Sequence, residues 1–377
     1  MRVLVLAIIL FLGACTCQDK HNISQLKEIY VGEYLSLTGS ESTFGINTHW
    51  GIKLALKEAE EKNLLKGYRI KLITIDTEGD LAKAKKAVRK LISKNVIALL
   101  GEIHSNLSVE GGKIAQEKKI PMISPGSTNP SVTDVGDYVF RVCYTDTFQG
   151  IVMAQFAHEE LKAKRVALLR DQTKYSIGLA DSFVTKFKSL GGKIVADFTY
   201  KSGELDFKEI LLKIKKAHFD ALFLPGYYTE VALIARQAKQ LGIRTKLLGG
   251  DGWDSPQLYE IAEDAINGGF FLNHFAIESP DKRTKDFLEK YQKEYGGEIP
   301  DANAALGYDA AMLLVDALSK ISEPTPELLR NQIAKTKNFP GVTGDITLNS
   351  NGDPIKGAIV VRVEGRVNRY VSTISAK

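Results

Sequence analysis

Two hydroxyl-bearing turns in the first third of the chain combine residue types that can hold an anion. The apolar run 97–100 is followed by a turn that reaches Ser105, and the apolar run 121–124 is followed by Gly126 and Thr128. If both runs are parallel strands of one sheet, both turns emerge at its carboxyl-terminal edge, where open α/β sheets bind ligands. The hydroxyls and helix-start N–H groups of Ser105 and Thr128 would then converge on one carboxylate. Helix capping alone explains the same two hydroxyls equally well.

More candidate side chains fall in turns that follow predicted strands. Together they offer one or two carboxylates and several aromatic rings, a set typical of pockets that hold a small polar molecule. For the aromatic residues, packing in the core or on the surface of a lobe is an equally good interpretation, and Asp251 among glycines fits an ordinary turn residue. The candidates are Phe44, Glu102, Ile103, His104, Ser127, Tyr175, Tyr227, Asp251 and Trp253.

The sequence lacks the motifs of common enzyme sites. It contains no Gly-x-Ser-x-Gly, no phosphate-binding Gly-Lys-Ser/Thr loop, no His-Glu-x-x-His and no Gly-x-Gly-x-x-Gly at a strand-to-helix turn. Glu102 and His104 could form an acid–base pair or half of a metal site. Because they lie only two residues apart on a loop, polar residues at the rim of a pocket are the better interpretation. We therefore expect a protein that is not an enzyme and uses no metal or cofactor.

Strand and helix patterns alternate from residue 28 to about residue 273, which favours parallel sheets with helices on both faces. A chain of 377 residues is long enough for two domains, and about ten strands are too many for one doubly wound sheet. The later helices need a sheet to cover, so we expect the chain to return to the first half before two final strands at 344–348 and 358–364. The predicted fold is α/β, with two Rossmann-like lobes whose parallel sheets are joined by a multi-strand hinge. Lobe 1 would comprise 27–143 and 274–348, and lobe 2 would comprise 144–273 and 349–377.

The first residues are typical of an exported protein. A single arginine precedes the apolar run 3–12, which is too short to span a bilayer but suits the core of a signal peptide. The run ends in Leu-Gly-Ala-Cys, which resembles a bacterial lipobox, and Cys15 would then become the lipidated first residue. An ordinary signal peptide cleaved near Ala14 is the alternative. We expect a signal peptide at 1–14 and a lipidated tether at 15–26.

Composition argues against a nucleic-acid partner. The chain is 44% hydrophobic and 25% charged, with a net charge of +5, but its lysines alternate with acidic residues along predicted helices. That pattern is typical of a solvated helix face. No basic run with interleaved aromatic residues and no zinc-finger spacing is present, so we expect no nucleic-acid binding.

At these turns the sequence resembles the leucine/isoleucine/valine-binding group of type I periplasmic binding proteins, the solute-binding lipoproteins of bacterial branched-chain amino acid transporters. The likeness covers nearly the whole chain after the signal peptide. It rests on 37–39 with Gly45, 101–105, 124–130, 170–175 with Gly178, 226–227, 249–253 and 308–310.

The resemblance implies a role for each matching residue. Ser105 and Thr128 would bind the α-carboxylate of an amino acid, and Thr128 and the carbonyl of Gly126 would face its α-ammonium group. Asp251 would supply the negative charge for that ammonium group from the other lobe. The remaining candidates would line or close the pocket, with Phe44, Ile103 and His104 around the ligand side chain and Tyr175 and Tyr227 above it. Glu102 and His104 make this wall more polar than an aliphatic side chain requires.

The expected function is that of a lipid-anchored, monomeric receptor in the periplasm or at the cell surface. It would close on an amino acid, with the branched-chain amino acids as candidate ligands, and deliver it to the membrane subunits of an ABC permease. A buried zwitterion needs donors at one end and acceptors with a negative charge at the other, and dividing these groups between lobes lets the ligand stabilise the closed form. The alternative is a ligand-sensing protein of the same fold that acts through a separate signalling partner.

Overall fold

In the computed structural model of the chain, which describes residues 26–375, the first sheet is entirely parallel. Its strands follow the order β2-β1-β3-β4-β5. The central strands are buried on both faces, as expected for a parallel sheet covered by helices on each side. The strands are β1 (Lys27–Leu35), β2 (Tyr68–Asp76), β3 (Ala98–Leu100), β4 (Met122–Ser124) and β5 (Val139–Arg141).

The second sheet is parallel except at one edge. Its order is β14-β13-β10-β9-β8-β6-β7, and β13 and β14 are antiparallel to their neighbours. A separate two-stranded ribbon is formed by β11 (Phe339–Gly341) and β12 (Gly344–Ile346). The strands of the second sheet are β6 (Arg165–Asp171), β7 (Lys193–Tyr200), β8 (Ala221–Phe223), β9 (Lys246–Gly249), β10 (Phe270–Asn273), β13 (Ala358–Glu364) and β14 (Val367–Ile374).

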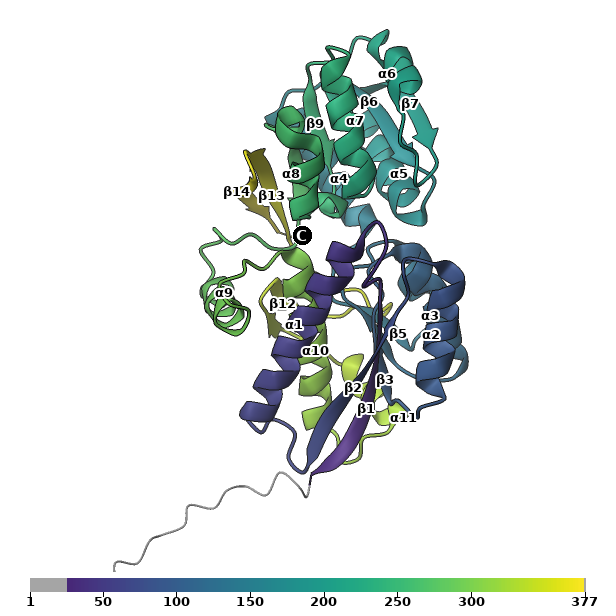
Figure 1. The fold of residues 1–377 in the computed structure, drawn as a ribbon, viewed down its shortest axis with the longest axis vertical. Coiled ribbons are helices and arrows are strands. Elements are labelled where there is room, and N and C mark those ends of the chain that lie inside the picture. The colour runs from purple at the N-terminus through teal and green to yellow at the C-terminus, as the bar shows by residue number, and fades with distance from the viewer. Residues whose placement is uncertain (1–25, 376–377) are drawn as a thin grey trace, which may run out of the picture.

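Helices cover the faces of both sheets (Figure 1). None of the helices within residues 26–375 is both long enough and apolar enough to span a membrane. The helices are α1 (Ser42–Glu61), α2 (Leu81–Ile92), α3 (Ser105–Glu117), α4 (Asp146–Gln155), α5 (Lys174–Ser189), α6 (Lys208–Lys215), α7 (Tyr228–Gln240), α8 (Pro256–Ala262), α9 (Lys282–Glu294), α10 (Ala302–Ser319) and α11 (Pro326–Ile333).

The late helix α10 packs closely against α1, which returns the chain to the first sheet. A Cβ atom at Gly51 would lie 1.9 Å from the carbonyl oxygen of Ala304, and one at Gly307 would lie 2.4 Å from that of Thr48. Only glycine allows the two backbones to approach this closely. Most residues of α10 are buried, because the helix lies between α1 and the sheet.

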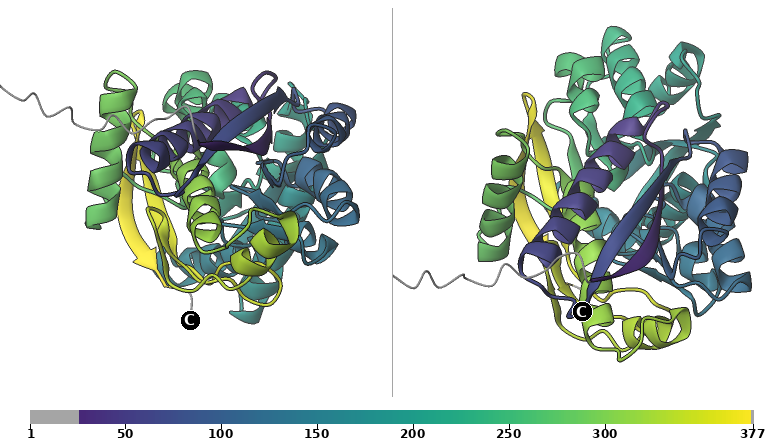
Figure 2. Two further views of the ribbon diagram at one scale, coloured as in Figure 1. Left: turned by 90° about the horizontal axis from the view of Figure 1, so that it is seen from below. Right: turned by 60° about the horizontal axis from the view of Figure 1, so that its bottom comes forward.

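Figure 1 shows one lobe above the other, with the first sheet below and the second above. The chain passes from the first sheet to the second after β5, returns after β10, and passes back before β13. In Figure 2, β13 and β14 appear as a long yellow hairpin beside α9. We propose the boundaries given above for the two lobes and use the names lobe 1 and lobe 2 in that sense.

The predicted parallel sheets are present, but the end of the chain differs from expectation. Of the two strands predicted to finish the fold, one is β12 in the small ribbon and the other is β13 in the second sheet. A third strand, β14, follows and forms the edge of the second sheet. Its residues alternate between exposed and half-buried and include charged side chains, so it lacks the apolar run that marks the other strands.

Candidate functional site

A small pocket lies between the two lobes. Its walls come from loops at the carboxyl-terminal ends of strands in both sheets and from the start of α10. This is the position at which open α/β sheets bind ligands. Seven of the predicted site residues line it, namely Phe44, Ile103, Gly126, Thr128, Tyr175, Tyr227 and Asp251.

The two serines of the predicted anion-binding turns support the pocket from behind. The Ser105 hydroxyl accepts a hydrogen bond from the backbone N–H of Asn129 at 3.2 Å, and the side chain is buried. The Ser127 hydroxyl lies 2.9 Å from the carbonyl oxygen of Glu102 and 2.8 Å from that of Ile103, to which it can donate. These bonds hold the turn after β3 against the turn after β4. Among the hydroxyl-bearing residues Ser105, Ser127 and Thr128, Thr128 is therefore the one that borders the pocket.

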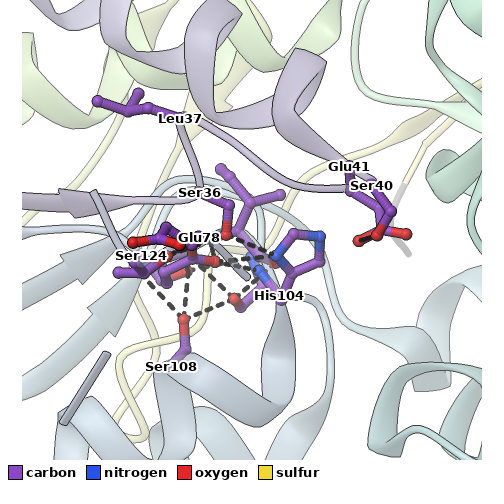
Figure 3. Close-up of polar contacts among 12 residues, drawn as sticks. Ser36, Leu37, Ser40, Glu41, Glu78, His104, Ser108 and Ser124 are labelled. Atoms are coloured by element: carbon purple, nitrogen blue, oxygen red, sulfur yellow. Dashed lines mark hydrogen bonds and ion pairs between the residues drawn. The ribbon is translucent and has the colours of Figure 1, made fainter. Parts of the chain in front are cut away.

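Glu102 is the centre of a buried hydrogen-bond network, and Figure 3 labels its partners Ser36 and His104. One carboxylate oxygen accepts from the hydroxyls of Ser36 at 2.6 Å and Thr77 at 3.0 Å. The other accepts from the backbone N–H groups of Ile103 and His104, both at 2.7 Å, and lies 3.2 Å from the Nδ1 atom of His104. Burial alone would raise the pKa of Glu102, but the His104 ring and these hydrogen bonds outweigh it and lower that pKa. Both oxygens are engaged, so Glu102 braces the turn after β3.

Asp251 is held by side chains of the second sheet's loops and helices. Its Oδ1 atom accepts from the Gln149 amide at 2.8 Å and from the Tyr175 hydroxyl at 2.9 Å. Its Oδ2 atom lies 3.2 Å from Nε2 of His274, whose ring stacks on Tyr144 at a centroid distance of 3.7 Å. Burial lowers the pKa of His274, which favours the neutral ring. The carboxylate is thus fixed in orientation while remaining at the pocket wall.

A second carboxyl group lies close by but does not line the pocket. Asp146 is fully buried, and its backbone N–H donates to the carbonyl oxygen of Thr128 at 2.8 Å. Burial, and then the charge of Asp251, raise the pKa of Asp146 well above its usual range. This favours the uncharged form of Asp146 and leaves Asp251 as the carboxylate that faces the pocket.

Aromatic side chains from both lobes meet over the pocket. Tyr175 and Tyr227 stack with ring centroids 5.0 Å apart. The Tyr227 ring meets His104 edge-on at 5.0 Å and Phe44 at 6.1 Å. Tyr227 comes from lobe 2, whereas His104 and Phe44 come from lobe 1, so these rings contact one another across the cleft.

Trp253 lies away from the pocket. Its side chain is fully buried in lobe 2, and its indole N–H donates to the carbonyl oxygen of Leu224 at 3.0 Å. A Cβ atom at Gly249 would lie 2.0 Å from the indole ring, so the ring packs directly on the end of β9. Trp253 therefore packs inside lobe 2 and does not line the pocket.

Several lining residues were not among the predicted ones. Asn273 ends β10 and His274 follows it directly, so the rule that selected the other candidates, a polar residue at the end of a strand, would also have selected them. Ala302, Asn303 and Leu306 lie in the first turns of α10. No local signal in the sequence indicates that this helix begins at the pocket.

The pocket walls offer the two kinds of polar group that a small zwitterion requires. Lobe 1 presents the Thr128 turn and the start of α3 behind it, which offer hydroxyl and N–H donors, and lobe 2 presents the oriented carboxylate of Asp251. The aromatic rings and Ile103 supply apolar walls. Glu102 and His104 provide no free acid–base pair facing the pocket, since the Glu102 oxygens are both engaged.

Comparison with known proteins gives a consistent result. Residues 28–367 match the model of a family described as periplasmic binding protein. The chain is 31% identical over 349 residues to Leu/Ile/Val-binding protein homolog 2 of Brucella abortus, an alignment that covers 92% of this chain and 93% of the relative.

Two solved structures share the fold. The leucine-binding protein LivK of Thermotoga maritima is 38% identical with a TM-score of 0.88, over 92% of this chain and 99% of that one. LivJ of Streptococcus pneumoniae, a branched-chain amino acid transporter substrate-binding protein solved with isoleucine, is 29% identical with a TM-score of 0.88, over 93% and 100%. These proteins are named as binding proteins rather than enzymes, and their fold confirms the predicted α/β fold class. The chain therefore belongs to the periplasmic binding protein family, in the type found among branched-chain amino acid ABC transporters.

Proposed function

We propose that this protein binds an amino acid between its lobes and delivers it to an ABC permease. The observation that carries the proposal is the placement of the Asp251 carboxylate opposite the Thr128 turn in one pocket. An amino acid's ammonium group needs a negative acceptor and its carboxylate needs donors, and the two walls offer these separately. LivK is named as a leucine-binding protein and LivJ was solved with isoleucine, which supports a ligand whose side chain is aliphatic or otherwise elongated.

Isothermal titration across the twenty common amino acids tests this function. The protein should first be unfolded, dialysed and refolded, because proteins that enclose a ligand can retain it through purification. We expect one-to-one binding of at least one amino acid and no chemical change in it. The proposal is wrong if none of the twenty binds to refolded protein whose circular dichroism matches that of the starting material.

We further propose that the protein is anchored by a lipid on Cys15. Family membership implies a periplasmic location, whereas the predicted signal peptide, lipobox and tether lie outside the described residues, apart from Leu26. Lipidation of Cys15 would hold the protein beside its permease. Labelling cells with a fatty-acid analogue should mark the wild-type protein and leave Cys15→Ala unlabelled. Equal labelling of both would refute the anchor, and Cys17→Ala is the matched control.

A further inference from the structure

A second groove between the lobes begins on the far side of Tyr227 from the pocket. Its lining includes His104 and Glu41 of lobe 1 and Glu230 of lobe 2, together with Tyr227 itself, which borders both spaces. The rings of Phe44, His104 and Tyr227 therefore separate the pocket from the groove. A ligand side chain that passes these rings would enter the groove.

Two buried polar side chains that line the groove have an atom without a hydrogen-bond partner within residues 26–375. Glu230 is 4% exposed, and its Oε1 atom accepts from the backbone N–H of Gly203 at 2.8 Å while Oε2 has no partner. His104 is 7% exposed, and its Nδ1 atom faces Glu102 while Nε2 has no partner. In Figure 3 the His104 ring lies on the side of the network toward Glu41. A ligand group or an ordered water in the groove would complete the bonding of these two atoms.

The groove is lined by acidic side chains from both lobes, and Lys174 and His104 also line it. Across the described part of the chain, no lysine or arginine nitrogen lies within 4.0 Å of the carboxylates of Glu41, Glu230 or the adjacent Asp171. By contrast, Glu110 at the outer rim is paired with two lysines. Burial raises the pKa of both Asp171 and Glu230, and the charge of Glu41 adds to each shift. Glu41 belongs to lobe 1 and the other two to lobe 2, so carboxyl groups from both lobes come together at this groove.

We propose that this groove receives the positively charged N–H group at the far end of a long, unbranched ligand side chain, so that the preferred ligand is a basic amino acid. This inference rests on the proposed function, because the α-groups must be held in the pocket. The ammonium or guanidinium group would donate to Glu230 and stabilise the ionised form of that carboxyl group, while its aliphatic stem packs on Phe44 and Tyr227. A bound metal is a poorer occupant, since no cluster of three metal-ligating side chains occurs within residues 26–375.

Lysine and norleucine are matched probes for the groove, because they share the same carbon chain and differ by the terminal ammonium group. Titration of the refolded full-length protein should show lysine binding at least ten-fold tighter than norleucine. Equal or tighter binding of norleucine or leucine would overturn the inference and leave the proposed function standing. Failure of every amino acid to bind would instead refute the proposed function itself.

Substitution of Glu230 assigns the preference to the groove. Glu230→Gln keeps the size of the side chain and its acceptor for Gly203, and it should reduce the lysine-to-norleucine ratio to near one without weakening norleucine. The control, Glu209→Gln, removes an exposed carboxylate on α6 and should leave the ratio unchanged. If Glu230→Gln retains the wild-type ratio, the groove is not the site of recognition. If Glu230→Gln fails to fold, Glu41→Gln at the half-buried lobe 1 wall tests the same point.

Discussion

Replacing Asp251 with asparagine removes the negative charge from the wall of the pocket while keeping the shape of the side chain. The asparagine oxygen can still accept from Gln149 and Tyr175, so lobe 2 should keep its local structure. The ligand's ammonium group would lose its charged partner in a site that is largely shielded from water. Removing one partner of a buried, hydrogen-bonded charge pair weakens binding by about 2–5 kcal/mol, or roughly 30- to 4,000-fold in Kd.

Isothermal titration of refolded protein measures this change directly, with the amino acid that binds wild-type protein most tightly. Asp264→Asn is the matched control, because Asp264 is an exposed carboxylate of lobe 2 that pairs with Lys239. Urea unfolding without ligand should show both variants within about 1 kcal/mol of wild type, the size of one hydrogen bond. A Kd for Asp251→Asn within three-fold of the wild-type value would refute the assignment of Asp251 to the ammonium group.

Three further outcomes are expected. Burial in the closed cleft raises the pKa of Asp254 to about 7, with the charge of Asp301 on the other lobe adding to the shift, so the closed form takes up a proton that separated lobes release. Ligand affinity should therefore fall as the pH rises from about 5 to about 7 and then level off. The affinity of Asp254→Asn should not change with pH over this range. A wild-type affinity that is equally independent of pH would contradict the prediction. Trp253→Phe should lower the free energy of unfolding, measured in urea, by about 1–3 kcal/mol because the indole hydrogen bond is lost. Its Kd for the ligand should change less than three-fold. A large loss of affinity would instead show that Trp253 is part of the site. Glu102→Gln should lower that free energy by about 3–5 kcal/mol because it breaks a buried charged network, and an unchanged denaturation midpoint would show that the network is dispensable.

Strand ends were the most informative feature of the sequence. Short apolar runs that stop at small or polar residues predicted the edges of both sheets, and the side chains at those edges do converge in one pocket. The sequence could not tell which side chain at a strand end turns inward. Trp253 and Asp251 are two residues apart in a short 3₁₀ turn, yet one packs into the core and the other faces the cleft.

Long-range packing accounts for what the sequence did not predict. The start of α10 borders the pocket only because α10 lies against α1 in lobe 1, a contact between segments about 250 residues apart. Gln149 reaches Asp251 from a helix 102 residues earlier in the chain. The edge strand β14 alternates exposed and half-buried residues, so its identity depends on pairing with β13 rather than on its own composition.

The three side chains that hold Asp251 come from helices α4 and α5 and from the residue directly after β10, all within lobe 2. Separating the lobes would leave those bonds intact, so the acceptor is already oriented when a ligand arrives. Such preorganisation reduces the entropy lost on binding. It also favours an order of events in which the ammonium group binds to lobe 2 first. Closure of lobe 1 over the ligand then determines the residence time of the ligand.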